Sequence, residues 1–282
     1  SGWMRPERVA AATEVLTGWG LRVRVGEHAL NRHTFLAGPD VQRLHDLNTA
    51  LRDPEVRGVL CLRGGYGLQR IVDDVDYAAV RADPKPVLGF SDITALHLGL
   101  WSAARLVTVH GPNAGRLDRD TEETARRALM TTAPIRVTAD RSEETFPVRV
   151  EGRAEGVLLG GNLTILAATA GTPHAPDPAG ALLLIEDVNE APYRVDRALV
   201  QLDRAGLLDG LAGVAVGQFT GCGGPAIVDT LRERLGHRGI PVLGGLPIGH
   251  GDHQVAVRLG TPFVLDANAG TLAERDRGAG ID

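Results

Sequence analysis

The first half of the chain alternates between helix-like and strand-like patterns of apolar residues. Apolar side chains recur every three or four residues, as on one face of a helix, over residues 9–19, 41–51 and 93–101. Short apolar runs or strict alternation, which are typical of strands, occur over residues 21–25, 59–62, 86–90 and 106–109. Strands that alternate with helices predict an α/β domain with a parallel sheet and helices on both faces.

The second half resumes this alternation after a polar interruption. Between residues 131 and 150 the pattern dissolves into Thr, Arg, Glu and Pro, which indicates a linker between two domains. Strand-like runs follow at 157–159, 181–185, 214–216 and 241–243, with helix-like segments from 163 and over 195–202. We therefore predict an N-terminal domain over 1–130, a linker over 131–150, and a smaller α/β C-terminal domain over 151–282.

Composition and charge exclude several classes of protein. The formal net charge of the 282 residues is −5 and no basic block occurs, so a nucleic-acid partner is not expected. No apolar run approaches the ~20 residues of a membrane helix, and no secretion signal is visible. We therefore expect a cytoplasmic protein without membrane contact. Cys61 and Cys222 stand apart, without metal or disulfide spacing.

Ser91 is the first candidate for chemistry, because it stands where a buried strand meets an amphipathic helix. In the sequence Gly-Phe-Ser-Asp at 89–92, a sharp turn would lift the hydroxyl above the sheet and direct the free N–H groups of the helix toward its target. The second glycine of a G-x-S-x-G elbow is missing, so a simple helix cap by Ser91 or Asp92 remains open.

A glycine-rich run, Arg-Gly-Gly-Tyr-Gly at 63–67, follows another strand. Adjacent glycines let the backbone approach a ligand closely, and their N–H groups could receive an oxyanion. An ordinary tight turn is the plain alternative. A phosphate cradle fits less well, because the run lacks the P-loop Lys-Ser/Thr and the G-x-G-x-x-G spacing.

A carboxylate and an imidazole complete the candidate chemistry. Glu186 and Asp187 follow the apolar run 181–185, where a carboxylate could hold an imidazole, although both could be solvated charges. His250, between two glycines, suits proton transfer near neutral pH, or it is an ordinary loop residue. Asp252 and His253 beside it leave a metal site open, but no further His or Cys stands nearby in the sequence, so we expect no metal.

Five stretches in order resemble the LD-carboxypeptidase family of serine peptidases: RGGYG at 63–67, GFSDIT at 89–94, GGNL at 160–163, EDVNEAPYRVDR at 186–197 and PIGHG at 247–251. The resemblance implies an α/β N-terminal domain, a smaller C-terminal domain and a site between them. It implies Ser91 as nucleophile, Glu186 as acid and His250 as base. It further implies the N–H groups of Asp92 and Gly65 as the oxyanion hole, without a cofactor.

The resemblance also implies a substrate, since the family cleaves the bond between an L-centre and a terminal D-amino acid in murein tetrapeptides. The partner would be a small peptide with a free C-terminal carboxylate, and the family suggests a homodimer. Arg63 and Arg194 are candidates to bind that carboxylate, because guanidinium binds it in two-pronged fashion, or they form structural ion pairs. Tyr66, Asn162 and Tyr193 are further candidate substrate contacts.

Two other functions remain open at this stage. A sister group hydrolyses peptidyl-nucleotide antibiotics of the microcin C kind, where we expect an aromatic residue of the C-terminal domain to stack on the base. All three Trp of this chain lie in the first half, at 3, 19 and 101, which favours the murein reading, although Tyr193 could stack. An inactive ligand-binding homologue is the second alternative.

The sequence departs from the family pattern in two places. The family usually opens with an apolar strand, whereas this sequence starts at Ser1, as if that strand were cut off or replaced. After His250 the family pattern has an Asn-containing run and a Pro-containing strand, where 252–254 and 257–259 differ here. Substrate contacts from that side are therefore open.

Overall fold

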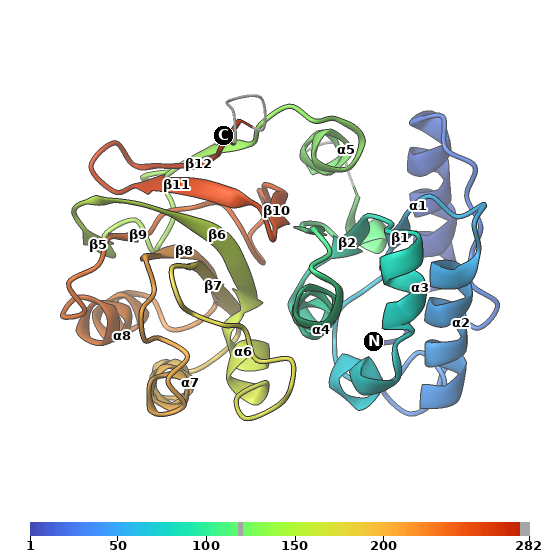
Figure 1. The fold of residues 1–282 in the computed structure, drawn as a ribbon, viewed down its shortest axis with the longest axis horizontal. Coiled ribbons are helices and arrows are strands. Elements are labelled where there is room, and N and C mark those ends of the chain that lie inside the picture. The colour runs from blue at the N-terminus through green and yellow to red at the C-terminus, as the bar shows by residue number, and fades with distance from the viewer. Residues whose placement is uncertain (118–120, 277–282) are drawn as a thin grey trace.

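Two β-sheets lie beside each other in the computed structural model, which describes residues 1–117 and 121–276 (Figure 1). The helices are α1 (Pro6–Gly18), α2 (Asp40–Arg52), α3 (Tyr77–Ala82), α4 (Thr94–Ala104), α5 (Glu122–Met130), α6 (Leu163–Ala168), α7 (Pro192–Arg204) and α8 (Pro225–Leu235). Short 3-10 helices are η1 (Leu68–Arg70), η2 (Val72–Asp74), η3 (Ser91–Ile93) and η4 (Ala114–Arg116). The strands are β1 (Val59–Leu60), β2 (Val87–Gly89), β3 (Thr108–His110), β4 (Arg136–Thr138), β5 (Arg149–Val150), β6 (Arg153–Asn162), β7 (Leu182–Val188), β8 (Gly213–Thr220), β9 (Val242–Leu243), β10 (Val257–Leu259), β11 (Pro262–Asp266) and β12 (Thr271–Glu274).

The first sheet has the order β1-β2-β3-β10, with β1 to β3 parallel and β10 antiparallel. Successive residues of a strand face opposite sides. Val87 accordingly packs in one apolar cluster with Leu51 of α2 and Leu96 of α4, whereas Leu88 packs in another with Ala125 of α5. The prediction of a parallel sheet with helices on both faces is therefore confirmed.

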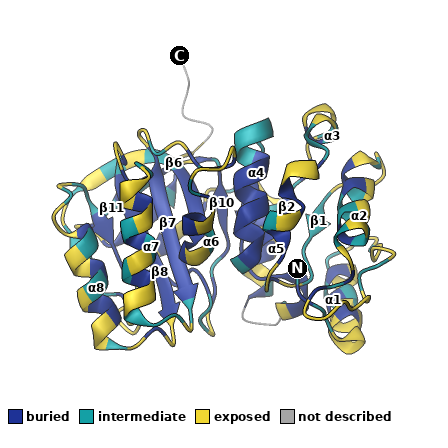
Figure 2. Ribbon diagram, turned by 90° about the horizontal axis from the view of Figure 1, so that it is seen from below, coloured by how far each residue is buried: buried dark blue, intermediate teal, exposed yellow. Residues whose placement is uncertain are grey.

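The second sheet has the order β4-β12-β11-β6-β7-β8-β9-β5 and is parallel from β6 to β9. Helices α6, α7 and α8 cover one face, and β11 and β12 lie toward the other side (Figure 1). Figure 2 shows the central strands buried and the outer faces of α7 and α8 exposed. The apolar run of β7 faces a core on both sides, which explains why its sequence does not alternate.

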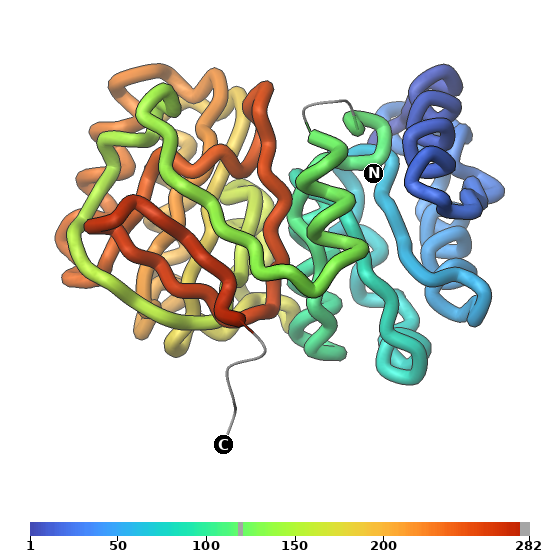
Figure 3. Tube along the Cα trace, turned by 90° about the horizontal axis from the view of Figure 1, so that it is seen from above, coloured from blue at the N-terminus to red at the C-terminus, as the bar shows by residue number. Residues whose placement is uncertain are grey.

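The second half of the chain also contributes a strand to the first sheet. β10, from the second half of the sequence, pairs with β3 of the first sheet, and in Figure 3 this red segment runs beside the green helix α5. Within residues 131–150, where we predicted a linker, β4 pairs with β12 and β5 with β9. The exact domain boundaries stay a prediction.

One strand prediction is wrong. Residues 21–25 form no strand, although their apolar and charged residues alternate. Leu21 and Val23 are half-buried while Arg22 and Arg24 are exposed, so the alternation reflects one-sided burial rather than pairing. Among the helices of the described residues, none has the length and apolar character needed to cross a membrane.

Candidate active site

Ser91 occupies a strained turn at the carboxyl end of β2. Its φ of 68° lies in the left-handed region, which costs a non-glycine residue about 1–2 kcal/mol. The preceding residue, Phe90, donates its N–H to Oδ1 of Asn113 at 3.3 Å, and η3 and α4 start directly after the strand. Strain of this kind concentrates at functional sites, so the conformation favours a nucleophile over a plain helix cap.

The glycine-rich run lies directly against this turn. A Cβ on Gly64 would lie 2.7 Å from Cβ and 3.0 Å from Oγ of Ser91, so only glycine fits there. The Leu68 N–H just after the run donates to Oδ2 of Asp92 at 3.1 Å, which ties the run to the elbow. Gly65, with a φ of 119°, lies against Gly2. The structure therefore places the predicted loop beside Ser91, with Gly64, which the sequence did not single out, in direct contact.

Glu186 and His250 are in direct contact. Nδ1 of His250 lies 2.6 Å from Oε2 of Glu186, a carboxylate with no exposed surface. Burial raises the pKa of Glu186 above its ordinary value, and the adjacent His250 opposes that rise. Gly249 has a φ of 134°, and a Cβ there would lie 2.8 Å from the Glu186 carboxylate. A glycine before the histidine is thus required by both backbone and space.

Ser91 follows a residue that packs on this pair. The rings of Phe90 and His250 lie 4.6 Å apart between centroids, so the imidazole packs on the residue next to Ser91. In the part of the chain that the structure describes, no hydrogen bond joins the Ser91 hydroxyl to His250. Such contacts are often long in unliganded enzymes and tighten with substrate. Because Glu186 holds Nδ1, Nε2 is left for Ser91.

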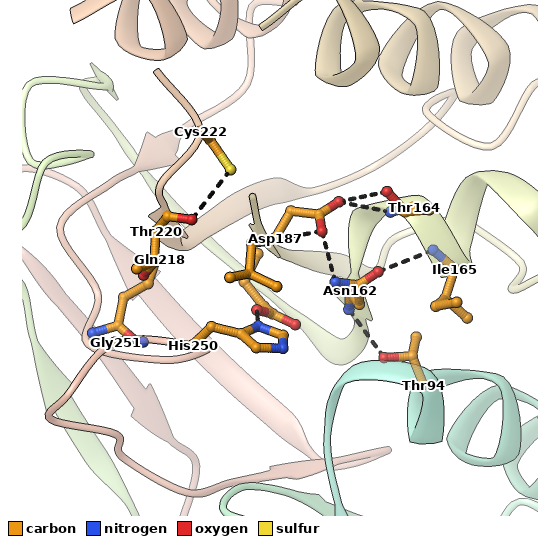
Figure 4. A network of polar contacts seen from close by, with 12 residues as sticks. Thr94, Asn162, Thr164, Ile165, Asp187, Gln218, Thr220, Cys222, His250 and Gly251 are labelled. Carbon is orange, nitrogen blue, oxygen red and sulfur yellow. Dashed lines mark hydrogen bonds and ion pairs between the residues drawn. The ribbon is translucent and has the colours of Figure 1, made fainter. Parts of the chain in front are cut away.

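The side chain of Asp187 lies on the opposite face of β7 from the side chain of Glu186. It is 3% exposed and accepts hydrogen bonds from Nδ2 of Asn162 at 2.9 Å and from the N–H and hydroxyl of Thr164 at 3.0 and 2.8 Å (Figure 4). Asn162 also caps α6 by accepting from Ile165 N–H, and its own N–H donates to Oγ1 of Thr94. This network joins the second sheet to α4, and it excludes solvated charges at 186 and 187.

Gln218 on β8 fixes the His250 loop and was not found from the sequence. Its Oε1 accepts from Gly251 N–H at 2.7 Å (Figure 4), and its Nε2 donates to His253 O at 3.0 Å and to Glu143 at 2.7 Å. A Cβ on Gly251 would lie 2.2 Å from Nε2 of Gln218. No motif marks this glutamine, so only the three-dimensional contact reveals it.

The predicted substrate contacts have other partners. Nη1 of Arg63 donates to Trp3 O at 2.8 Å, and Arg194 pairs with Glu190 at 3.5 Å and with the Tyr193 hydroxyl at 3.2 Å. Tyr66 and Tyr193 are 52% and 59% exposed, while Asn162 is buried with both ends of its side chain hydrogen-bonded. Their roles toward substrate stay predictions.

Two buried histidines lie behind the elbow. Nε2 of His97 contacts Gly89 O at 2.9 Å, and burial lowers the pKa of His97 to about 4. Burial also lowers the pKa of His110, which packs 6.0 Å from the Phe90 ring. Within residues 1–117 and 121–276, no three His, Cys, Asp or Glu side chains are placed to hold a metal ion.

Comparisons with known proteins show the family of the chain. Models of the LD-carboxypeptidase N-terminal and C-terminal domains match residues 1–111 and 155–265. A putative carboxypeptidase of Streptomyces coelicolor is 44% identical, covering 96% of this chain and 90% of the relative. The murein tetrapeptide carboxypeptidase of Pseudomonas aeruginosa is 36% identical, with coverages of 92% and 91%. The solved muramoyltetrapeptide carboxypeptidase of Oxalobacter formigenes is 31% identical, with a TM-score of 0.82 and coverages of 97% and 94%.

Fold and site together define a two-sheet α/β protein with a buried carboxylate–imidazole pair beside a strained serine. The chain belongs to the LD-carboxypeptidase family of serine peptidases. It is a hydrolase of the serine carboxypeptidase type, so the family assignment and the enzyme class predicted from the sequence are confirmed.

Proposed function

We propose that Ser91, Glu186 and His250 form the catalytic triad of an LD-carboxypeptidase that removes the terminal D-amino acid from murein-derived peptides. The 2.6 Å contact between Glu186 and His250, beside a serine in the left-handed conformation, carries this proposal. The murein substrate is supported by the names of the Pseudomonas and Oxalobacter relatives, which the chain matches over more than nine-tenths of its length.

The mechanism is acyl transfer without a cofactor. Nε2 of His250 takes the proton of the Ser91 hydroxyl, whose oxygen attacks the carbonyl carbon next to the terminal residue. The buried Glu186 stabilises the imidazolium and fixes its tautomer through Nδ1. His250 then returns the proton to the leaving amine, and water attacks the acyl-enzyme in the reverse sequence of proton transfers.

The oxyanion is received by backbone N–H groups in this proposal. Asp92 N–H belongs to the first turn after the elbow, where helix donors lack internal partners. The Gly65 N–H belongs to the glycine-rich loop, in which the preceding residue, Gly64, lies against Ser91. Loss of one such donor costs ~10²–10³-fold in rate.

Two measurements test the proposed function. The protein should release D-alanine from murein tetrapeptide and be labelled by a fluorophosphonate at Ser91, whereas Ser91→Ala should do neither. Equal labelling of Ser91→Ala would overturn the nucleophile. Cleavage of a peptidyl-nucleotide alone would favour the self-immunity activity, and labelling without cleavage of either would favour a binding role.

We further propose that the enzyme is a cytoplasmic homodimer, as the family resemblance suggests. The cytoplasmic setting is supported by Cys61 and Cys222, which are both free, as is usual for cysteines in the reducing cytosol. Light scattering coupled to gel filtration would report the mass, and a monomer at working concentration would contradict the dimer. Cell fractionation would report the compartment.

A further inference from the structure

Arg116 lies beside the candidate triad, on a segment that the backbone fixes firmly. In η4, Ala114 N–H donates to Cys61 O at 2.9 Å and Gly115 N–H donates to Leu62 O at 3.0 Å. Arg116 itself donates its N–H to Asn113 O at 2.7 Å. The start of the Arg116 side chain is therefore held next to the strand end that precedes the glycine-rich run.

The guanidinium of Arg116 reaches over the elbow. Its Cζ lies 5.7 Å from the centroid of the Phe90 ring, the same ring that packs 4.6 Å from His250. The guanidinium can therefore lie no further from the imidazole than the sum of these two separations. The side chain is exposed, and a cation over an aromatic face keeps a defined position without an ion pair.

Arg116 differs from the other arginines near the site in having its donors free. Within residues 1–117 and 121–276, its guanidinium makes no hydrogen bond or ion pair. Arg63 donates to Trp3 O, and Arg194 is engaged by Glu190 and Tyr193. Five unsatisfied N–H donors in a fixed fork match a carboxylate in two-pronged geometry.

The terminal carboxylate of a bound peptide would lie at a limited distance from the Ser91 oxygen. A scissile carbonyl carbon in attack position lies ~3–3.5 Å from the nucleophile. The carboxylate carbon of a single terminal residue lies at most ~3.8 Å further along the chain. A charge-assisted N–H···O bond adds ~2.8 Å. Together these lengths place a cation that binds the terminal carboxylate within roughly 10 Å of the Ser91 oxygen. A guanidinium over the ring of the neighbouring residue, Phe90, is a candidate for that position.

We propose that Arg116 binds the free C-terminal carboxylate of the peptide substrate, with Phe90 beneath it as support. This assignment rests on the proposed function, because it names the group that makes the enzyme an exopeptidase. It replaces Arg63 and Arg194 as the carboxylate-binding residue. A carboxylate held one residue beyond the scissile bond limits cleavage to the last residue of the peptide.

Binding to an inactive enzyme tests Arg116 separately from catalysis. In the Ser91→Ala background, calorimetry would compare murein tetrapeptide with its C-terminal amide. We expect the free acid to bind about 10- to 100-fold more tightly, and Arg116→Gln to abolish this preference while leaving the affinity for the amide unchanged. Arg105→Gln is the matched control, because Arg105 lies 5.0 Å over Trp101, at the other end of α4 from Ser91, and should keep the preference.

Three outcomes would overturn the assignment: a preference that survives Arg116→Gln, equal losses for acid and amide, or no preference in the Ser91→Ala protein. Equal losses would indicate that Arg116 only supports the Phe90 elbow. Arg63→Gln and Arg194→Gln in the same background show whether another arginine carries the preference. Hydrolysis by the unmodified enzyme decides the proposed function independently of these affinities.

Discussion

Glu186 and Asp187 are neighbouring buried carboxylates on β7 for which the structure predicts opposite effects of neutralisation. Glu186 faces His250 and accepts one charge-assisted bond, and its Oε1 has no hydrogen-bond partner in the described part of the chain. Asp187 faces α6 and accepts bonds from Asn162, Thr164 and its neighbour Val188. One carboxylate is placed for chemistry and the other for structure.

Glu186→Gln should reduce activity strongly and increase stability. An amide can hold the wrong imidazole tautomer and cannot stabilise an imidazolium, so kcat should fall ~10³–10⁴-fold with little change in KM. Burial raises the pKa of Glu186, so between the ordinary carboxyl pKa and this raised value the folded state retains a proton that the unfolded state has lost. The free energy of unfolding of the parent therefore falls as pH rises through the folded pKa.

The glutamine side chain lacks this cost. The stability advantage of Glu186→Gln should accordingly be absent at pH below the ordinary carboxyl value and increase toward neutral pH. Asp187→Asn should behave conversely, losing about 2 kcal/mol because charge-assisted bonds to several donors weaken, while Ser91 still reacts with a serine probe. Urea unfolding at several pH values and tetrapeptide kinetics measure both variants.

Similar changes of kcat and stability in Glu186→Gln and Asp187→Asn would contradict the different roles of the two carboxylates. A Glu186→Gln protein that is destabilised at neutral pH would show that its buried carboxylate contributes net stability. Normal turnover of the same variant would remove Glu186 from the mechanism. An Asp187→Asn protein with intact stability and reduced kcat would assign the catalytic role to Asp187 instead of Glu186.

Three further outcomes are expected. The pKa of His97 is lowered from 6.5 to about 4, so on acidification the unfolded state binds a proton at this residue before the folded state does. About 3 kcal/mol of stability is therefore lost as the pH falls between these values. His97→Gln should flatten this pH dependence, measured by urea unfolding. Gly249→Ala should reduce kcat about 100-fold by displacing the Glu186 contact, whereas Gly239→Ala, also at positive φ but in open space, should leave kcat unchanged. Ser91→Gly should be about 1 kcal/mol more stable than Ser91→Ala, because glycine relieves the strain at a φ of 68°; equal melting temperatures would contradict the strained elbow.

The periodicity of the sequence predicted most elements, because strands and helices that face a core carry the pattern of that core. β7 and α4 are such elements, buried along nearly their whole length. Residues 21–25 misled because half-burial produces the same alternation as pairing. The pattern of apolar residues indicates which side of a segment is buried, but it does not indicate which element covers that side.

The site was predicted by motif rather than by local chemistry. Ser91, Glu186 and His250 each had a plain alternative in their own segment, and the order of five stretches resolved it. Gln218 and Asn113 carry no signal of this kind, because an amide that holds a loop is recognised only by its partners. Arg258 lies in the stretch 257–259, which departs from the family pattern. It is buried because it pairs with Glu274 at 2.6 Å and donates to carbonyls at the end of α5.

β10 belongs to the first sheet and follows closely after the segment that carries His250, the proposed base. Ser91 follows β2 of the first sheet, whereas Glu186 lies on β7 of the second, so packing between the halves must position one against the other. The His250 loop is held by Gln218 on β8 at one end, and a few residues later the chain enters the first sheet as β10, next to β3. Six residues lie between His250 and Val257, and an extended chain spans at most ~3.3–3.6 Å per residue. The proposed base is therefore tethered to both sheets.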